Sequence, residues 1–420
     1  MIGDFIGKAD WIGQVMERAS KEDYGLIEKT LVSELGIRES EIGQYVVDQL
    51  VELDRMIPAH TKDLETSEEL IQRELKRRAG REAAYWKAVV DKKPLSYRTF
   101  LQCNGITEDD FVRVETWLEE NREKAVVARQ KCLVDVPDEQ RMKSERVADY
   151  HGHLSRLIEE RLDLPGFSQA VDVQPTNQFN RFYSMQRTVT INLDVPIAYS
   201  KAREDRRKVS IDEFLYAYGH EVMGHVAHWY QTQNALVPAL MKFGTSLVTP
   251  SAEAIAFFYE RQLFDVLQDS SETRHILGIG CFDAILERKE SMQHLVRYFI
   301  MVGTYAAHLV ASAADDRTIG NEVVQEKIYR KLAKVTIIPE EAGFYMQKIW
   351  RFDQEGNLDP NVFGDTFYAT DGIDQGLRTF AAHGKKYTTH KKEIDRAILT
   401  GYWTREGFEE HMRLTARMSE

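Results

Sequence analysis

Apolar and polar residues follow one another along this chain mainly at helical spacing. Up to about residue 165, apolar residues recur three and four positions apart with little Gly or Pro, as in "SKEDYGLIEKTLVSELG" and "TEDDFVRVETWLEENREKAVVARQKCLV". The segment at 162–180, "LDLPGFSQAVDVQPTNQFN", interrupts this pattern with two prolines and polar turn residues. We therefore expect a helical N-terminal region over 1–165 and a second region over 166–420, the two forming one continuous globular unit.

One stretch has the two-residue alternation of a half-buried strand. In "RTVTINLDVPIAY" the apolar residues Val189, Ile191 and Leu193 alternate with polar ones over a β-branched run. The remainder returns to helical spacing, and the sequence contains neither an internal repeat nor a low-complexity tract. The pattern predicts a mainly α protein with a small β-sheet beside the helix that follows this strand.

Two helices downstream of the strand have recognisable start signals. Ser210, with Glu213 three residues later, forms a capping box for a helix that begins near Ile211. A further helix is expected at "TPSAEAIAFFYERQLFDVL", where Thr249 can cap and Pro250 occupies the first helical position. These two helices carry most of the residues that are candidates for a functional site.

Charge and composition exclude several classes of partner. The 420 residues carry a formal net charge of −12, which disfavours binding to DNA or RNA because phosphate backbones require a basic surface. The basic run "RELKRRAGR" at 73–81 is interleaved with Glu74 and Glu82 and is typical of a solvated helix face. No run approaches the roughly 18 apolar residues that span a bilayer. Charged residues also interrupt the N-terminal stretch, so we expect a cytoplasmic protein with no membrane partner.

The segment "HEVMGH" has the composition of a metal-binding motif, but its spacing exceeds the common H-E-x-x-H by one residue. In a regular helix, residues four apart are offset by roughly 40° and face the same way, whereas residues five apart are offset by roughly 140°. A π-bulge absorbs the extra residue and restores the shared face, and Gly224 suits an irregular backbone there. We therefore expect an i→i+5 turn between His220 and His225.

Three side chains form the predicted metal site. A catalytic zinc prefers three protein ligands and one open position, which His220, His225 and Glu253 on the next helix provide. If they hold Zn²⁺, the metal lowers the pKa of its bound water toward about 7 and polarises a substrate carbonyl. Glu221 adjoins a ligand without being needed as one, so it is the candidate general base. The alternative is that one histidine packs in the core and the other is solvated.

These motifs resemble those of two groups of zinc peptidases. "HEVMGH" is similar to the HExxGH motif of the dipeptidyl-peptidase III family, in which the longer spacing holds zinc. Over roughly 180–350 the chain also resembles a large bacterial family of predicted gluzincin peptidases, named as a domain of unknown function, with HExxPGHHxQ and EGWALYxE motifs. Here "HEVMGHVAHWYQ" lacks the proline and the doubled histidine, while "EAIAFFYE" keeps Glu253, Ala256 and Glu260. The resemblance implies a zincin-like catalytic region over 166–420.

A third motif extends this resemblance. The family's P-G-Q-A-x-x-Y corresponds to "PEEAGFY", which preserves Pro339, Ala342 and Tyr345. We expect Tyr345 to donate a hydrogen bond to the oxyanion of the reaction, with a buried structural tyrosine as the alternative. The family's R-x-x-x-D-x-G-x-H corresponds to "RYFIMVGTY", where Met301 and Tyr305 replace the aspartate and the histidine. We therefore expect a substrate preference different from that of the family.

Other polar residues have structural alternatives. Glu260, one heptad after the predicted glutamate ligand, is expected to accept a hydrogen bond from a ligand imidazole, unless it forms a surface salt bridge. His228 is either a similar outer group or a helix-surface histidine. His151 and His153 in "YHGHL" have no carboxylate partner nearby in the sequence, so we expect them in a solvated turn. His308 lies on an apolar helix face and is expected to be a hydrogen-bonded core histidine.

Three functions are compatible with these features. The first is a zinc metallopeptidase of the gluzincin type, and the second is a zinc hydrolase of a small non-peptide amide. The third is a non-catalytic helical binding protein whose metal site is structural or vestigial. Glu221 disfavours the third function, because a structural site needs no general base and closes its fourth position. The first two differ in substrate, a peptide or a small amide, and between them only the family resemblance favours the peptide. Endo-, amino- or carboxypeptidase action depends on the shape of the cleft.

Overall fold

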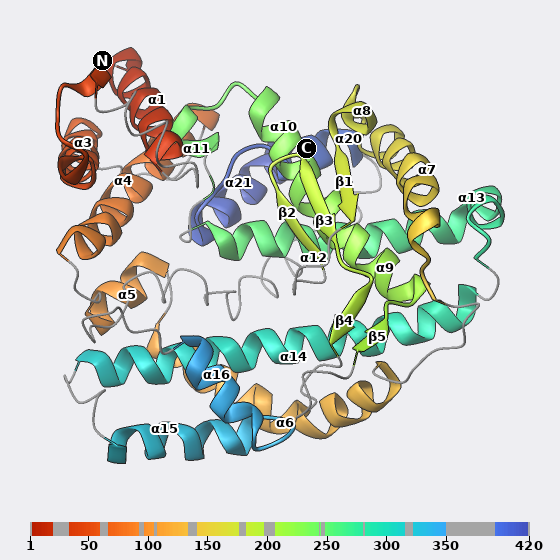
Figure 1. Cartoon of the computed structure of the whole chain (residues 1–420). Coiled ribbons are helices and arrows are strands. Elements are labelled where there is room, and N and C mark those ends of the chain that lie inside the picture. The colour runs from red at the N-terminus through yellow and green to blue at the C-terminus, as the bar shows by residue number, and fades with distance from the viewer. Residues whose placement is uncertain are drawn as a thin grey trace.

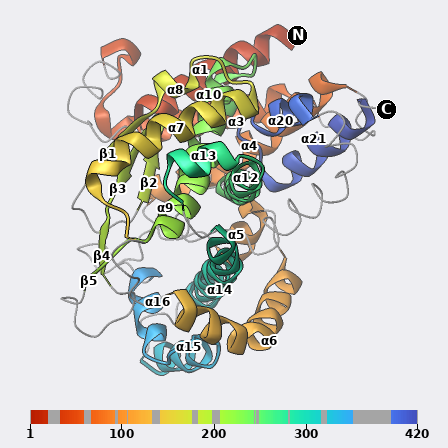
Figure 2. The same cartoon turned by 90° about the vertical axis from the view of Figure 1, so that its right-hand side faces the viewer.

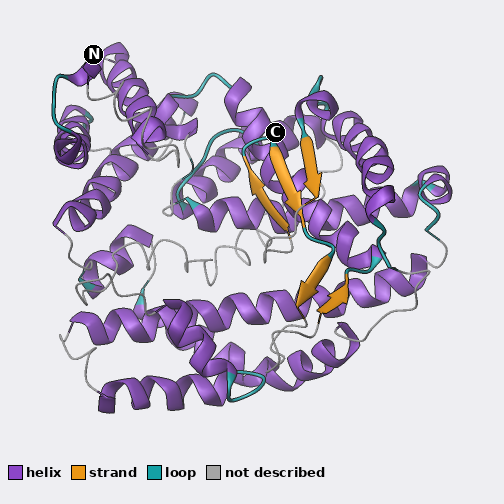
Figure 3. Cartoon of the chain, in the orientation of Figure 1, coloured by secondary structure: helices purple, strands orange, loops and turns teal. Residues whose placement is uncertain are grey.

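Most of the described chain forms helices, as the three- and four-residue spacing of its apolar residues predicts (Figure 3). A small sheet lies beside the helix that carries the histidine pair, so the predicted fold class, mainly α with a small β-sheet, is confirmed. The computed structural model describes residues 2–19, 33–58, 66–91, 96–104, 107–132, 141–175, 182–196, 206–242, 244, 248–279, 282–315, 322–349 and 391–418.

Helices dominate the region that precedes the sheet. Their bounds are α1 (Ile2–Ala19), η1 (Glu39–Glu41), α3 (Ile42–Met56), α4 (Ser67–Asp91), α5 (Tyr97–Asn104), α6 (Glu108–Cys132), α7 (Ser144–Leu162) and α8 (Phe167–Ala170). The predicted solvated turn at "YHGHL" is wrong, because both histidines lie inside α7. The apolar periodicity of that segment buries Val147, Tyr150 and Leu154 on one face, and this tertiary packing stabilises a continuous helix.

Helices also dominate the chain after the sheet. Their bounds are α9 (Ile211–Tyr218), η3 (Gly219–Val226), α10 (Ala227–Asn234), α11 (Ala239–Lys242), α12 (Thr249–Asp269), α13 (Ser271–Ile276), α14 (Phe282–Asp315), α15 (Glu322–Val335), α16 (Glu341–Ile349), α20 (Lys391–Ile398) and α21 (Arg405–Met418). Helix α12 begins one residue earlier than expected: Val248 is the N-cap, and Thr249 is already helical.

The sheet is built around the strand that the alternating pattern predicts. Strand β3 (Thr188–Ile191) pairs in parallel with β1 (Asp172–Pro175) and antiparallel with β2 (Phe182–Met185), in the order β1-β3-β2. Val189 and Ile191 are buried, as their alternation requires. A second antiparallel pair, β4 (Asp194–Pro196) with β5 (Arg206–Lys208), leads directly into α9. Strands β2 and β3 pack against η3 and so support the histidine-bearing turn.

Two long helices, α12 and α14, organise the molecule (Figure 1). Helix α12 packs against η3, while α14 packs against α6, α15 and α16. Viewed from the side, α14 lies among these three helices and α12 lies with the sheet-bearing half of the chain (Figure 2). Arg122 in α6 donates to the carbonyl oxygens of Thr336 and Ile337, so the N-terminal region packs directly on the later helices.

The basic run in α4 is not the solvated face that its charges suggest. Glu74, Arg78 and Glu82 are fully buried where α4 meets α21. The Glu74 carboxylate accepts hydrogen bonds from the backbone N–H and the hydroxyl of Thr404, at 2.5 and 2.8 Å. Burial of these charges is tolerated because each carboxylate meets a donor, and α4 is thereby fixed to the C-terminal helix.

The sequence analysis expected no run long enough to span a bilayer, but one of the described helices, α14, is long and apolar enough to cross a membrane by length and composition. Its most apolar window has a mean hydropathy of 1.3, but 61% of that window is buried inside the fold. This extent of burial is typical of the core helix of a soluble protein, and the contacts of α14 with α6, α15 and α16 account for it.

Candidate metal centre

The helix that carries the histidine pair starts at the predicted capping box. Ser210 Oγ accepts the N–H of Glu213, and the Glu213 carboxylate accepts the N–H of Ser210 at 3.1 Å. Both residues are buried, so these bonds satisfy backbone donors that water does not reach. From this start, α9, η3 and α10 follow one another without a break from Ile211 to Asn234.

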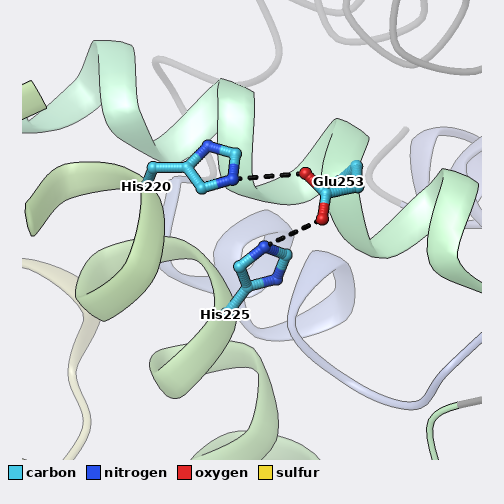
Figure 4. Close-up of side chains that lie close together, drawn as sticks. All are labelled: His220, His225 and Glu253. Atoms are coloured by element: carbon cyan, nitrogen blue, oxygen red, sulfur yellow. Dashed lines mark ion pairs between the residues drawn. The ribbon is translucent and has the colours of Figure 1, made fainter. Parts of the chain in front are cut away.

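The extra residue between the histidines is absorbed by a π-helix, as predicted. Element η3 has π geometry over Gly219–Val226, so its backbone hydrogen bonds join residues five apart. His220 and His225 therefore project from the same side of the helix, with ring centroids 4.9 Å apart (Figure 4). The five-residue spacing does not separate the two imidazoles.

Gly224 is required by close packing rather than by an unusual backbone angle. Among the described residues it is not one of the glycines with positive φ. A Cβ at this position would stand 2.5 Å from Cα of Ala256 and 2.7 Å from its Cβ. Gly219 has a similar role, because its Cβ would lie 3.1 Å from Cα of Glu260. These two glycines let η3 and α12 approach closely enough for their side chains to share one site.

Glu253 reaches across from α12 and lies between the two histidines (Figure 4). Its two carboxylate oxygens are each 3.2 Å from an imidazole nitrogen, Oε2 from His220 Nε2 and Oε1 from His225 Nε2. One ligand atom from each residue can be chosen so that all three lie within 4.8 Å of one another. Ligands of a tetrahedral zinc stand roughly 3.3 Å apart, given bond lengths of about 2 Å. These three residues are therefore a group that could hold a metal ion.

Without a metal, the His220 imidazole and the Glu253 carboxylate favour each other's charged forms. Burial disfavours the imidazolium, but the carboxylates of Glu253 and Glu260 outweigh it and raise the pKa of His220 well above its usual value. Burial likewise opposes the charged form of Glu253, but the two imidazoles lower the pKa of this carboxyl well below its usual range. A metal ion would replace the proton on His220 as the partner of the Glu253 charge.

Glu260 lies behind His220, away from Glu253. It is fully buried, and its Oε2 is 3.6 Å from His220 Nδ1. Within the described residues, neither of these two atoms makes a hydrogen bond of ordinary length. The other oxygen, Oε1, accepts a bond of 2.7 Å from the side-chain amide of Gln293 in α14. If His220 bound a metal through Nε2, its Nδ1 would keep the proton. Glu260 faces this Nδ1 and could accept a hydrogen bond from it.

A cavity of about 310 Å³ opens beside the predicted metal ligands. Helices α9, η3, α12 and α14 all contribute to its wall. The lining residues are Val209, Glu213, Tyr216, Ala217, His220, Glu221, Glu253, Phe257, Met292, Val296 and Ile300. Glu221, the predicted general base, thus shares one hollow with two of the predicted ligands.

Tyr345 is placed apart from the other predicted site residues. It is buried on α16, and its hydroxyl donates to the carbonyl oxygen of Phe299 at 3.4 Å. It is not among the residues that line the cavity. Tyr216, which sequence reasoning did not single out, does line it, and its buried hydroxyl lies near the Glu260 carboxylate, although not at ordinary hydrogen-bond geometry. The available signal was its position four residues before His220, on the same helix face.

Three further histidines that the sequence analysis considered have structural partners. His228 is buried and donates from Nε2 to the carbonyl oxygen of Gly401 at 2.9 Å, so it is neither an outer group of the metal site nor a surface residue. His151 Nδ1 lies 2.7 Å from the hydroxyl of Tyr218. His308 Nδ1 lies 2.8 Å from the hydroxyl of Tyr97, which agrees with the hydrogen-bonded histidine expected there.

Comparison with known proteins adds little to this geometry. No protein-family model matches the sequence, and no curated protein matches it. Among solved structures, one described as "BsuCP Crystal Structure" aligns with 99% of this chain and 90% of its own, at 10% sequence identity and a TM-score of 0.39. That similarity is too low to define a shared fold, so the candidate site rests on the residues described above.

Proposed function

We propose that this protein is a zinc-dependent metallohydrolase that cleaves peptide bonds. The observation that carries the proposal is the position of Glu253 beside a cavity that Glu221 lines: one carboxylate oxygen is 3.2 Å from His220 Nε2, and the other is 3.2 Å from His225 Nε2. Two imidazoles and one carboxylate are the ligands of many catalytic zinc sites, which keep one position open. The donor set supports a catalytic site rather than a closed structural one.

Glu221 has the role of general base in this proposal. When bound, zinc would act as a Lewis acid toward the substrate carbonyl and increase the acidity of a water molecule. Glu221 removes a proton from the attacking water as its oxygen adds to the carbonyl carbon. The same carboxyl then gives that proton to the amine as the C–N bond breaks. Its place in the cavity wall next to His220 supports this role.

Glu260 has the role of orienting His220. The two buried atoms that face each other, Glu260 Oε2 and His220 Nδ1, need to approach by a few tenths of an ångström to reach ordinary hydrogen-bond length. A proton held on Nδ1 leaves Nε2 as the nitrogen that coordinates metal. Gln293, which donates to the other oxygen of Glu260, supports this arrangement from α14.

Tyr216 replaces Tyr345 as our candidate hydroxyl donor to the developing oxyanion. Its side chain lines the cavity, whereas the Tyr345 hydroxyl bonds to a backbone carbonyl on α14. Burial, followed by the nearby Glu260 carboxylate, raises the pKa of Tyr216 well above its usual value, so the phenol keeps its proton at neutral pH. A protonated phenol in the cavity wall is a suitable donor.

Metal content and cleavage of a peptide library, measured on one preparation, test the proposal. We expect about one zinc per chain by elemental analysis and defined cleavage products by mass spectrometry. His220→Ala and His225→Ala are expected to lose the metal and the activity together, while His153→Ala in α7 serves as a matched control. Full zinc occupancy in both ligand variants would disprove the assigned site, and zinc-loaded protein that cleaves no peptide would disprove the peptidase activity.

A further inference from the structure

The cavity beside the metal ligands has one apolar wall. Met292, Val296 and Ile300 follow one another at four-residue intervals on α14, so they share one face of that helix. Met292 is buried, but Val296 and Ile300 remain half-buried because they border the hollow. Phe257 of α12 closes the wall from the other side and packs with Val296 and Ile300 in a small cluster of its own. These mutual contacts hold the wall in place without a ligand, and the cavity in front of it stays open.

The polar groups of the cavity give it a negative character. Besides the predicted metal ligands, the polar side chains in its lining are those of Glu213, Tyr216 and Glu221. The described lining residues include no lysine and no arginine. A carboxylate from a substrate side chain seated against α14 would lose water beside Val296 and Ile300 with no basic side chain in the described lining to pair with it, which is unfavourable. An apolar side chain would instead cover Val296 and Ile300, which water now reaches in part.

We propose that this cavity binds one apolar side chain of the substrate, that of a residue adjoining the scissile bond, and that the α14 wall selects apolar over acidic residues. The inference rests on the proposed peptidase function and names its substrate class. Glu221 and Glu253 border the same cavity, so a side chain seated against α14 would hold the neighbouring peptide bond close to the ligands and the base. Val296, at the middle of the wall, is then a residue that determines specificity.

Peptides that differ only at the residues flanking the cleaved bond test this inference with the zinc-loaded full chain. We expect kcat/KM for Leu and Phe to exceed that for Ala by at least about 10-fold, with Glu the poorest. Val296→Phe, which fills the cavity, should reduce kcat/KM for Leu and Phe by about 10-fold or more and change that for Ala less. Val296→Lys should reduce the discrimination against Glu. Val323→Lys, at an exposed site on α15, is the matched control and should leave these ratios unchanged.

The outcomes separate this inference from the proposed function. Cleavage of all peptides at equal rates, or unchanged ratios in both Val296 variants, would overturn the cavity assignment and leave the peptidase function in place. If zinc-loaded protein cleaves none of the peptides, the peptidase function fails, and calorimetric binding of the same peptides to Glu221→Gln protein decides the inference. Tighter binding of Leu and Phe than of Glu would then support the cavity assignment, and equal or undetectable binding would overturn it.

Discussion

Gly224 and Ala256 pack so closely that no side-chain atom fits between them, since a Cβ on Gly224 would stand 2.5 Å from Cα of Ala256. This contact brings η3 against α12 and sets the distance between the histidines and Glu253. Gly224→Ala is expected to lower the free energy of unfolding by about 1–3 kcal/mol, because the two helices must separate. We also expect weaker zinc binding, measured by chelator competition.

Gly152→Ala is the matched control for this substitution. Gly152 lies within α7, and a Cβ there would meet no atom within 4 Å. Alanine is a better helix former than glycine, so this variant should be as stable as the parent chain or more stable by up to about 1 kcal/mol. Equal thermal stability of the two variants would contradict the packing argument for Gly224.

Glu221→Gln separates catalysis from metal binding. The amide retains the size of the side chain but removes the base, so we expect zinc content to stay the same and hydrolysis to fall by roughly 10²–10⁴-fold. Glu253→Gln should instead weaken the metal, because it removes the anionic ligand between the histidines. Elemental analysis and initial rates on the same samples measure both effects. Parent-level activity of Glu221→Gln would rule out the general-base mechanism.

Gln293→Leu tests the support behind the first ligand. The substitution removes the 2.7 Å bond to Glu260 without contact with the metal ligands themselves, so zinc affinity should fall by roughly 10-fold or somewhat more. Gln262→Leu on α12 is the control, because its amide pairs with Arg161 instead. Chelator competition gives both affinities. If the two variants bind zinc equally well, Gln293 has no part in orienting His220.

Two tyrosine variants decide between the candidate hydroxyl donors. Tyr216→Phe should leave zinc in place and slow turnover by roughly 10²–10³-fold, the loss usual for one oxyanion donor. Tyr345→Phe should change turnover little, since its hydroxyl bonds to the Phe299 carbonyl. The comparison requires kcat for both variants with one substrate. A large loss in Tyr345→Phe alone would restore the role expected from the sequence motif.

Stability should fall in mild acid because of buried neutral histidines. Burial lowers the pKa of His228 to about 4 and that of His308 to about 4, against about 6.5 in an unfolded chain. Between pH 6.5 and pH 4 the two histidines take up protons in the unfolded chain but not in the folded one. Their titration therefore leaves the free energy of unfolding unchanged above pH 6.5 and lowers it as the pH decreases from 6.5 toward 4. The expected loss between pH 7 and pH 5 is on the order of 2 kcal/mol for each histidine.

Denaturant unfolding at the two pH values measures this loss, and His308→Gln provides the comparison. That variant should show a pH effect smaller by about 2 kcal/mol, whatever its stability at pH 7. An unchanged difference between pH 7 and pH 5 would show that His308 titrates alike in the folded and unfolded chains.

Local signals predicted the parts of the structure that depend on neighbours in sequence. The Ser210 and Glu213 capping box, the alternation at Val189 and Ile191, and the π-turn that the histidine spacing demands all follow from residues within a few positions of one another. Each of these features is decided by backbone hydrogen bonding or by side-chain periodicity, which are short-range effects.

Long-range packing decided the features that the sequence did not predict. Whether Tyr345 reaches the cavity depends on how α16 packs on α14, and no local pattern contains that information. His151 was expected in a solvated turn because no carboxylate lies near it in the sequence, whereas its actual partners, the Tyr218 hydroxyl and the Val171 carbonyl, come from distant parts of the chain. The apolar wall on α14 was present in the sequence as a four-residue repeat, but its use as a cavity wall requires α12 opposite it.

The π-turn also sets which side chains of the following helix, α10, face the C-terminal segment. Beyond η3, α10 presents His228 to the Gly401 carbonyl and Thr232 to the Leu399 carbonyl and the Gly401 N–H. Deleting one residue of the turn, Met223 for example, would restore the common H-E-x-x-H spacing but rotate α10 by about 100° and draw it back by about 1.5 Å. The three bonds to 399–401 would then be lost. The longer motif is thus tied to the docking of the C-terminal segment, so shortening it requires a compensating insertion before α10.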